Sequence, residues 1–199
     1  MAEKTISTPL DEKTVRSLEL GDIIYLDGMV YTMRDEAHIR ALEMHDTGEV
    51  LPVELDSAAV YHCGPITARD GRSWKVIAAG PTTSARMNSM EPRFIETFGV
   101  RALIGKGGMN EATADAMEKQ GCVYLAITGG TAILAARGIE SVEWVDWLDM
   151  GMPEALWHLK CRHLGPLVVA MDAHGNSMYA NVRDAMNEAE DRVREIIGI

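Results

Sequence analysis

In the second half of the chain, segments with the hydrophobic pattern of strands alternate with segments that have the pattern of helices. Short apolar runs predict strands over 101–105 and 122–128, and amphipathic patterns predict helices over 91–99, 110–121 and 131–138. Gly99 and Gly121 end two of these helices, and Asn110 precedes one, as cap residues commonly do. The alternation predicts an α/β domain.

The first half predicts a polar arm and then strands around one helix. The first 20 residues are polar and contain Pro9, so we expect an extended arm. Two strand-like runs in 22–33 flank Asp27-Gly28, a dipeptide that favours a hairpin. Residues 34–45 predict a helix. AAVYHCG and SWKVIAAG predict two strands around a polar loop that holds Pro65, Asp70 and Gly71.

The last third predicts two more sheet elements and a terminal helix. SVEWVDW alternates like a half-buried strand, whose inward positions are Val142, Trp144 and Trp147. Residues 167–179 predict a hairpin that turns at 172–176. An apolar stripe then predicts a helix that packs on the domain or on a partner, and packing on the domain is favoured. The stripe consists of Val182, Met186, Ala189, Val193 and Ile196.

Several predicted strands are too closely connected for crossovers, so the sheet should contain antiparallel pairs. We predict an arm over 1–20, a domain over 21–180 and a C-terminal helix over 181–199. The length of 199 residues, with 47% hydrophobic and 25% charged, suits one domain with an appendage.

The net charge of −11 gives no support to nucleic-acid or anionic-membrane binding. An anionic substrate would need a local cluster of cations. The N-terminus lacks the apolar core of a signal peptide, and no stretch approaches the roughly 18 apolar residues of a membrane span. We expect a cytoplasmic protein.

The three cysteines, Cys63, Cys122 and Cys161, are widely spaced and form no C-x-x-C pair, so no disulfide framework is predicted. Their contexts favour small core or boundary residues. The alternative is that they hold three corners of an iron–sulfur cluster, for which thiolates are the usual ligands.

Three glycine-rich junctions follow predicted strands: Gly80-Pro81, GKGGM and TGG. Such junctions bind ligands in α/β proteins because their N–H groups point outward. A nucleotide loop fits poorly, because five residues separate Gly99 from Gly105 and Gly107 replaces the hydroxyl residue after Lys106. An independent nucleotide-binding domain is therefore a weak alternative.

Cations cluster at the predicted strand ends. Lys106 lies between glycines, Arg86 follows Gly80, and Arg34 opens a helix. Two of them also have an ordinary interpretation: a solvated turn lysine for Lys106 and a surface arginine paired with Glu91 for Arg86. His38 lies one turn after Arg34, so its side chain is predicted to point toward the same site as that of Arg34. The alternative is a partly buried histidine.

The stretch GPTTSARM adds the hydroxyls of Thr82, Thr83 and Ser84 to these cations. Three cations that converge would suit a small dianion. A threonine is a poor base, so nearby cations would have to stabilise its alkoxide. The stretch therefore predicts part of an anion pocket with a hydroxyl that handles a proton.

The motifs GDIIYLDGMVYTMRDEAH, GPTTSARM, GKGGM, GMPEALW and DAHGNSMY, in this order, resemble the β subunit of the two-subunit iron–sulfur hydro-lyases. These are the class I fumarases and L(+)-tartrate dehydratases, and the resemblance covers about residues 5–180. It implies an α/β fold, a swivelling β/β/α three-layer domain with a mixed sheet. It also implies a larger α subunit whose three cysteines carry a [4Fe-4S] cluster, so the cysteines of this chain receive no cluster role.

The resemblance implies roles for the residues at these motifs. Arg34, Arg86, Lys106 and Gly107 would bind substrate carboxylates, with Thr83 nearby, and Thr82 would be the base in preference to Thr83. Asp35, His38 and Ser84 would support them. No residue would bind a metal.

The most favoured function is fumarate hydratase, the reversible addition of water to fumarate, in a site shared with the α subunit. The alternatives are an L(+)-tartrate dehydratase β subunit, with mesaconate as a further related substrate, and a non-catalytic assembly subunit. A homodimer is expected where the chain is isolated.

Overall fold

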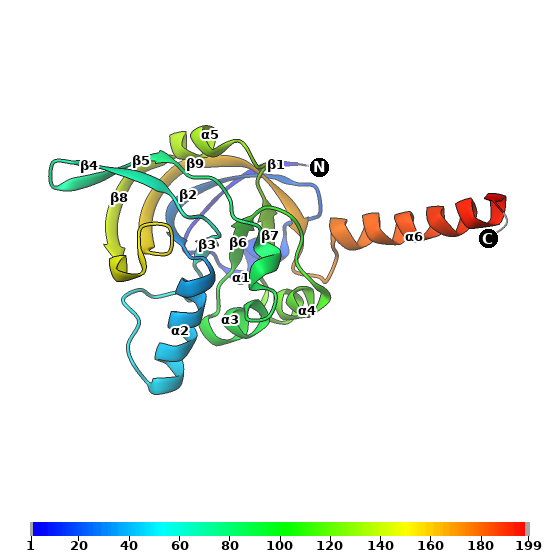
Figure 1. Cartoon of the computed structure of the whole chain (residues 1–199), viewed down its shortest axis with the longest axis horizontal. Helices are drawn as coiled ribbons and strands as arrows, with labels where there is room; N and C mark the ends of the chain where they lie inside the picture. The colour runs from blue at the N-terminus through cyan, green and yellow to red at the C-terminus, as the bar shows by residue number, and fades with distance from the viewer. Residues whose placement is uncertain (1, 198–199) are drawn as a thin grey trace.

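The computed structural model describes residues 2–197, without the side chains of 191–193 and 195. A seven-stranded mixed sheet has the order β1-β2-β3-β6-β7-β9-β8, and β4 and β5 form a separate hairpin (Figure 1). The strands are β1 (Glu3–Ser7), β2 (Ile23–Thr32), β3 (Ala59–Tyr61), β4 (Ile66–Asp70), β5 (Ser73–Ala78), β6 (Ala102–Gly105), β7 (Val123–Ala126), β8 (Ile139–Asp146) and β9 (Leu156–Met171). The helices are α1 (Glu12–Arg16), α2 (Asp35–Thr47), α3 (Glu91–Phe98), α4 (Glu111–Gln120), α5 (Ala132–Arg137) and α6 (Met178–Ile197), with 3₁₀ turns η1 (Ser84–Met87) and η2 (Leu148–Met150).

The long strand β9 curls the sheet into a partial barrel. β2, β3, β6 and β7 are parallel neighbours, and β9 runs antiparallel to β7. β9 also pairs with β2, from Ile23 opposite Val168 to Thr32 opposite Trp157. Because one strand contacts both ends of the parallel set, the set closes on itself.

Two hydrophobic cores lie on opposite faces of these strands. Tyr61, Ile104 and Leu125 belong to one core, while the alternate residues Leu103 and Tyr124 belong to the other. Helices α2, α3 and α4 contribute to the second core and lie together on one side of the sheet (Figure 1). Burial on both faces explains why these strands read as continuous apolar runs.

The predicted mixed α/β fold is confirmed, and so are the helices of its central region. The side chain of Asn110 accepts a hydrogen bond from the Thr113 backbone N–H and caps α4. Gly121 ends α4 in the left-handed region with φ 70°.

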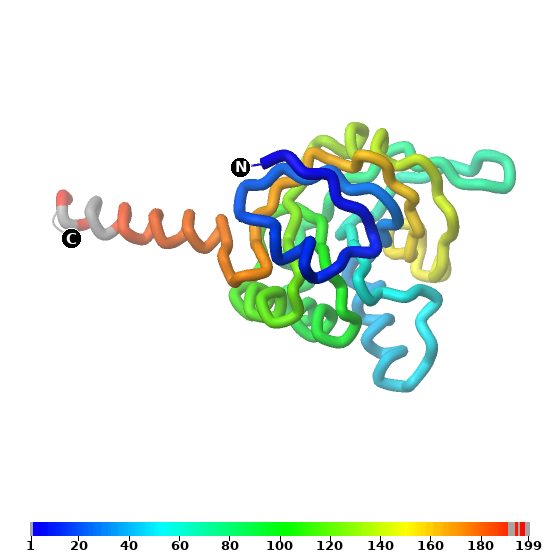
Figure 2. Tube along the Cα trace, turned by 180° about the vertical axis from the view of Figure 1, so that it is seen from behind, coloured from blue at the N-terminus to red at the C-terminus, as the bar shows by residue number. Residues whose placement is uncertain are grey.

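The prediction of an N-terminal arm is wrong. β1 pairs parallel with β2, and Leu10, Val15 and Leu18 are buried in the first core. Figure 2 shows this segment lying across the body of the molecule. β1 is the edge strand and buries only Ile6, so its sequence reads as polar.

The predicted hairpin at Asp27-Gly28 is also wrong, because β2 runs through it. Gly28 has φ 99°, and the register with β9 shifts between Leu26 and Gly28, so the glycine marks a bulge. A Cβ on Gly28 would lie 2.4 Å from Thr8 Oγ1. The expected polar loop at 65–72 is instead largely β4, paired with β5.

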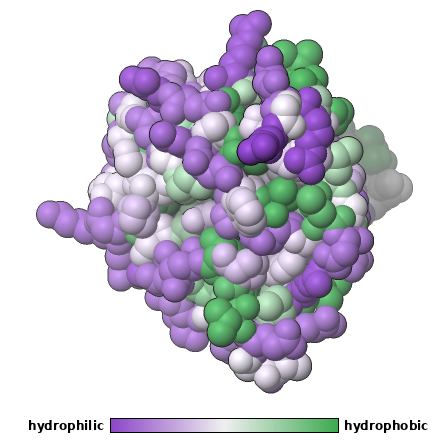
Figure 3. All heavy atoms as spheres, turned by 90° about the vertical axis from the view of Figure 1, so that its left-hand side faces the viewer, coloured by the Kyte–Doolittle hydropathy of each residue, from purple (hydrophilic) through white to green (hydrophobic). Residues whose placement is uncertain are grey.

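Trp144 was predicted to face inward, yet it is 66% exposed, while Val142 packs against the first core. A register shift between Val142 and Trp144 in β8 breaks the alternation on which the prediction depended. Figure 3 views the side where β4 and β8 lie and shows hydrophobic patches separated by hydrophilic side chains. Trp147 packs partly buried against the second core.

The hairpin predicted at 167–179 has its turn but not its second strand. The Asp172 N–H donates to the Asn176 carbonyl at 3.1 Å, and α6 begins at Met178. β9 itself begins much earlier, at Leu156.

Helix α6 projects away from the domain instead of packing on it (Figures 1 and 2). Val182, Met186 and Ile196 are 59%, 66% and 83% exposed. The prediction that this stripe packs on the domain is therefore wrong for these residues, and the side chain of Val193 lies outside the described part. No helix in the described chain combines the length and hydrophobicity needed to span a membrane.

Candidate active site

Two of the predicted site residues follow the carboxyl ends of parallel strands. Arg34 comes two residues after β2, and Lys106 comes one residue after β6. Parallel strands place these ends on one edge of the sheet, where α/β proteins bind ligands. His62 follows β3 at the same edge.

Backbone contacts bring GPTTSARM to this edge. The Thr82 N–H donates to the His62 carbonyl at 2.6 Å, and the Ser84 N–H donates to the Lys106 carbonyl at 3.1 Å. Thr83 forms a parallel bridge with Lys106. A Cβ on Gly107 would lie 3.8 Å from Thr83 Cγ2, so the two loops are in contact. The predicted meeting of the threonines with the GKGG loop is therefore present.

A carboxylate joins the two predicted arginines. Arg86 contacts Asp35 through Nε and Nη2, each at 3.0 Å from a different carboxylate oxygen. Asp35 lies 4.0 Å from Arg34 Nη2, and Arg34 Nε lies 3.1 Å from Glu154. The expected surface pair of Arg86 with Glu91 does not form, since Glu91 is buried elsewhere.

Lys106 differs from the arginines in its surroundings. It is half-buried, and within residues 2–197 its ammonium group makes no ion pair. Arg86 is 54% exposed and Arg34 is 20% exposed. Separate loops therefore present the three cations at one edge of an acidic protein. Their roles stay predictions.

The side chain of His38 does not point toward the same site as that of Arg34, so this prediction is wrong. Its side chain is fully buried, and Nδ1 lies 2.8 Å from the Arg34 carbonyl oxygen. Nε2 faces Glu91 Oε1 at 3.5 Å. Burial opposes a charged His38, but the Glu91 carboxylate raises the pKa of His38 above its ordinary value.

Sequence reasoning missed His62, Glu91 and Tyr124. All three are fully buried. His62 Nε2 lies 3.3 Å from Glu91 Oε2, and its Nδ1 lies 2.9 Å from Ser84 Oγ, which lies 2.9 Å from the Tyr124 hydroxyl. Burial opposes the charge on Glu91, but the two histidines lower the pKa of Glu91 to about 2. The sequence signal that could have identified this group was the position of His62 directly after a buried strand.

Donor atoms of His38, His62 and Glu91 lie within 4.8 Å of one another, close enough to be considered as a metal site. The cysteines do not offer a comparable set. Cys63 and Cys161 lie in the first core and Cys122 in the second, all buried. Burial raises the pKa of Cys161 to about 12 and raises those of the other two thiols as well. These thiols do not fit an iron–sulfur cluster.

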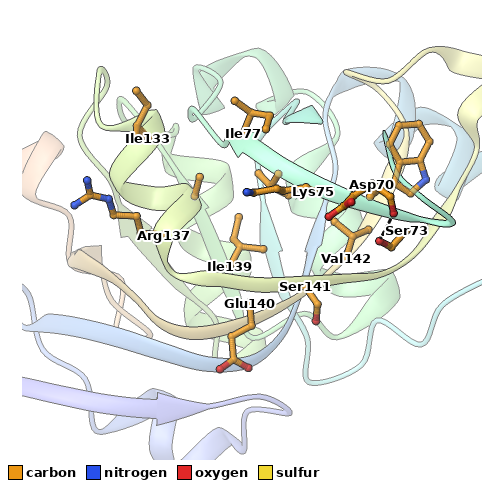
Figure 4. Close-up of a pocket in the computed structure, with 13 residues that line it drawn as sticks. Asp70, Ser73, Lys75, Ile77, Ile133, Arg137, Ile139, Glu140, Ser141 and Val142 are labelled. Carbon is orange, nitrogen blue, oxygen red and sulfur yellow. Dashed lines mark hydrogen bonds between the residues drawn. The ribbon is translucent and has the colours of Figure 1, made fainter. Parts of the chain in front are cut away.

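A cavity of about 570 Å³ lies apart from the cationic residues. Figure 4 shows its lining from β5, α5 and β8, including Lys75, Arg137 and Ser141. Neither Arg34, Arg86 nor Lys106 borders it. The cationic edge is thus separate from this open pocket.

A model of the family described as "Fumarase C-terminus" matches residues 2–182. The chain is 46% identical over 191 residues to a putative L(+)-tartrate dehydratase subunit beta of Methanocaldococcus jannaschii, covering 96% of each. It is 37% identical over 195 residues to the L(+)-tartrate dehydratase subunit beta of Escherichia coli K12, covering 98% of this chain and 96% of the relative. It is also 41% identical over 192 residues to a putative class I fumarate hydratase of Geobacillus stearothermophilus, covering 96% of this chain but 36% of that relative.

Proposed function

The chain belongs to the Fumarase C-terminus family, and from this membership we propose that it is the β subunit of a hydro-lyase for a four-carbon dicarboxylate. The favoured reaction is the reversible addition of water to fumarate, which gives L-malate. One observation carries the proposal: Arg34, Arg86 and Lys106 come from separate loops and face one edge of the sheet beside Thr82 and Thr83.

The cations bind the substrate carboxylates. Arg86 uses the guanidinium edge that Asp35 leaves open, because Asp35 takes only Nε and one side of Nη2. Lys106 supplies a positive charge with no competing ion pair among the described residues. Arg34 completes the set from the start of α2. Together they neutralise the charge that accumulates on a carboxylate when the neighbouring carbon loses its proton.

Thr82 exchanges the proton of the reacting carbon. In the direction from malate to fumarate its oxygen takes the proton, and in the reverse direction it returns the proton. A free threonine is too weak a base, so the nearby cations must stabilise its alkoxide. Thr82 is half-buried and Thr83 is exposed, which favours Thr82 for a group that works away from bulk water.

A second chain completes the site. The relatives from M. jannaschii and E. coli are named as beta subunits, and the cationic edge lies apart from the open pocket of Figure 4. The family resemblance implies a [4Fe-4S] cluster held by an α subunit, and the buried cysteines of this chain do not fit one. When bound there, the cluster would supply Lewis-acid activation of the substrate hydroxyl.

L(+)-tartrate is the second candidate substrate, because two of the relatives are named as tartrate dehydratase subunits. Tartrate carries one hydroxyl more than malate, and a site selects for a hydroxyl by pairing it with a polar group. The two substrates therefore need a direct comparison.

The test is co-expression with the α subunit and anaerobic reconstitution of the cluster. Fumarate absorbance is then followed with malate, and oxaloacetate formation is followed with L(+)-tartrate. We expect turnover of malate that is lost in Thr82→Ala and Arg86→Ala complexes. Normal assembly without turnover of either substrate would favour the non-catalytic assembly subunit. Full activity in both variants would contradict the site.

A further inference from the structure

A buried polar cluster lies directly behind the cationic edge and makes no contact with solvent. Its centre is Glu91, the first residue of α3. Glu91 faces His38 of α2 on one side and His62, at the end of β3, on the other. An ionised carboxylate at 0% exposure is costly to bury unless both oxygens find partners. The positions of the hydrogens on the polar atoms of this cluster therefore need to be assigned.

The Arg34 end of the cluster fixes two hydrogens on His38. Nδ1 lies 2.8 Å from the Arg34 carbonyl oxygen, which can only accept, so Nδ1 carries a hydrogen and donates it. Nε2 lies 3.5 Å from an oxygen of Glu91, an ion-pair distance at which the carboxylate favours a second hydrogen on the ring. A hydrogen on both nitrogens makes His38 an imidazolium whose charge balances the carboxylate.

The other end of the cluster reaches the threonine turn. His62 Nε2 lies 3.3 Å from Glu91 Oε2, and its Nδ1 lies 2.9 Å from the Ser84 hydroxyl. The Ser84 hydroxyl in turn lies 2.9 Å from the Tyr124 hydroxyl. A continuous chain of polar contacts therefore joins Glu91 to the turn that holds Ser84.

We propose that Glu91 is a positioning residue, which holds the Arg34 backbone and the turn from Thr82 to Arg86 in a fixed relation through His38 and His62. Ser84 lies inside that turn, and its N–H also donates to the Lys106 carbonyl. The cluster therefore links the backbone of all three elements that carry the cations. This inference rests on the proposed function, because the elements it fixes are those assigned to the substrate.

A metal ion is the competing occupant of the same donors, since His38, His62 and Glu91 could ligate one. We favour hydrogens because Nδ1 of each histidine already bonds to a protein group and the Glu91 carboxylate favours a charged His38. The inner nitrogens and both carboxylate oxygens make no hydrogen bond with a described residue, only ion-pair contacts. Measurement of zinc, iron, manganese and nickel in the purified full chain separates the two. One equivalent of a tightly held metal that ligates these residues would overturn the proposal.

The kinetic test uses Glu91→Gln in the assembled complex. The amide keeps the shape of the side chain but cannot accept from both histidines. We expect kcat/KM for malate to fall roughly 10- to 100-fold, because displacement of reacting groups by about 1 Å has effects of that size. Glu96→Gln changes an exposed glutamate of the same helix and should leave kcat and KM unchanged. Because Glu91→Gln could fail to fold, Ser84→Ala serves as a milder second variant, with an expected fall of about fivefold.

A measurement that does not depend on turnover distinguishes the positioning role of Glu91 from the proposed function. Nitrogen NMR of the histidine rings in the full chain should show His38 with both nitrogens protonated at neutral pH, and Glu91→Gln should abolish that signature. Wild-type kcat and KM in a folded Glu91→Gln complex, or a neutral His38, would overturn the positioning role. A wild-type complex that assembles and shows the His38 signature but turns over no dicarboxylate would overturn the proposed function instead.

Discussion

The guanidinium of Arg86 and the carboxylate of Asp35 face each other edge to edge, with Nε to Oδ1 and Nη2 to Oδ2 both at 3.0 Å. The two residues are 51 positions apart, on η1 and at the start of α2. The Nε contact is a hydrogen bond and the Nη2 contact is an ion pair, and two such contacts hold the plane of a guanidinium as well as its position. Asp35 therefore orients an arginine that is otherwise half exposed, and it leaves the opposite edge of the fork open.

Asp35→Asn should lower kcat of the assembled complex about tenfold while changing KM less, as loss of a bidentate pair releases the guanidinium. The lost negative charge strengthens attraction of a dianion, which offsets part of the effect on KM. Steady-state kinetics with malate measure both constants. Glu36→Gln, the next residue on α2 and exposed, is the control. Identical kinetics for Asp35→Asn and wild type would mean that something else orients Arg86.

Thr82→Ala should reduce turnover about 10²- to 10⁴-fold, the range for loss of a general base, and Thr83→Ala should reduce it much less. Exchange of the carbon-bound hydrogen of malate with deuterated water isolates the proton step. We expect this exchange to vanish in Thr82→Ala and to persist in Thr83→Ala. The reverse ranking would assign the base to Thr83.

The position of Lys106 and of the threonines at strand ends could be predicted from their glycine-rich turns, whereas their meeting depends on contacts of the segment after the antiparallel strand β5. Helix caps at Asn110 and Gly121 were equally readable, since each depends on a single local residue. These features follow from short-range chemistry that the sequence displays directly.

The His38, Glu91 and His62 cluster could not be predicted, because it depends on three elements that are distant in sequence. Glu91 at a helix start looks like an ordinary first-turn acid, and only the packing of α3 on the sheet buries it. The hairpin at Asp27-Gly28 was wrongly predicted for a related reason. The close contact that requires a glycine at position 28 comes from Thr8, which lies in the segment that was predicted to be an arm.

Gly105→Ala should destabilise the chain by about 1–3 kcal/mol, as expected for an overpacked core. The new Cβ would lie 2.0 Å from Ser84 Oγ and 3.0 Å from the Tyr124 hydroxyl. Thermal unfolding of the full chain measures the change. Gly129→Ala is the control, because its Cβ would meet only Lys106 Cδ at 3.6 Å. The double variant Gly105→Ala/Ser84→Ala should recover part of the loss, and no recovery would place the clash elsewhere.

Asp22→Asn should lower the thermal stability of the chain at neutral pH, because Asp22 ties β1 to β2. Its carboxylate accepts from Lys4 Nζ at 2.7 Å and from the Ala2 N–H at 2.8 Å. The Lys4 hydrogen bond, followed by that of Ala2, lowers the pKa of Asp22 from 3.8 to about 2. A carboxyl whose pKa is lowered by folding stabilises the native state above its unfolded pKa, and it loses that contribution as pH falls through the folded value.

The melting temperatures of wild type and Asp22→Asn should therefore differ by a constant amount at neutral pH and converge as pH falls from 3.8 toward about 2. Asp115→Asn, which changes an exposed carboxylate of α4, should track wild type throughout. A difference that persists unchanged at the lowest pH would mean that the asparagine disturbs packing rather than removing a charge. Equal melting temperatures at neutral pH would mean that β1 is held to the sheet by its backbone pairing with β2 alone, and that the charge of Asp22 adds nothing to it.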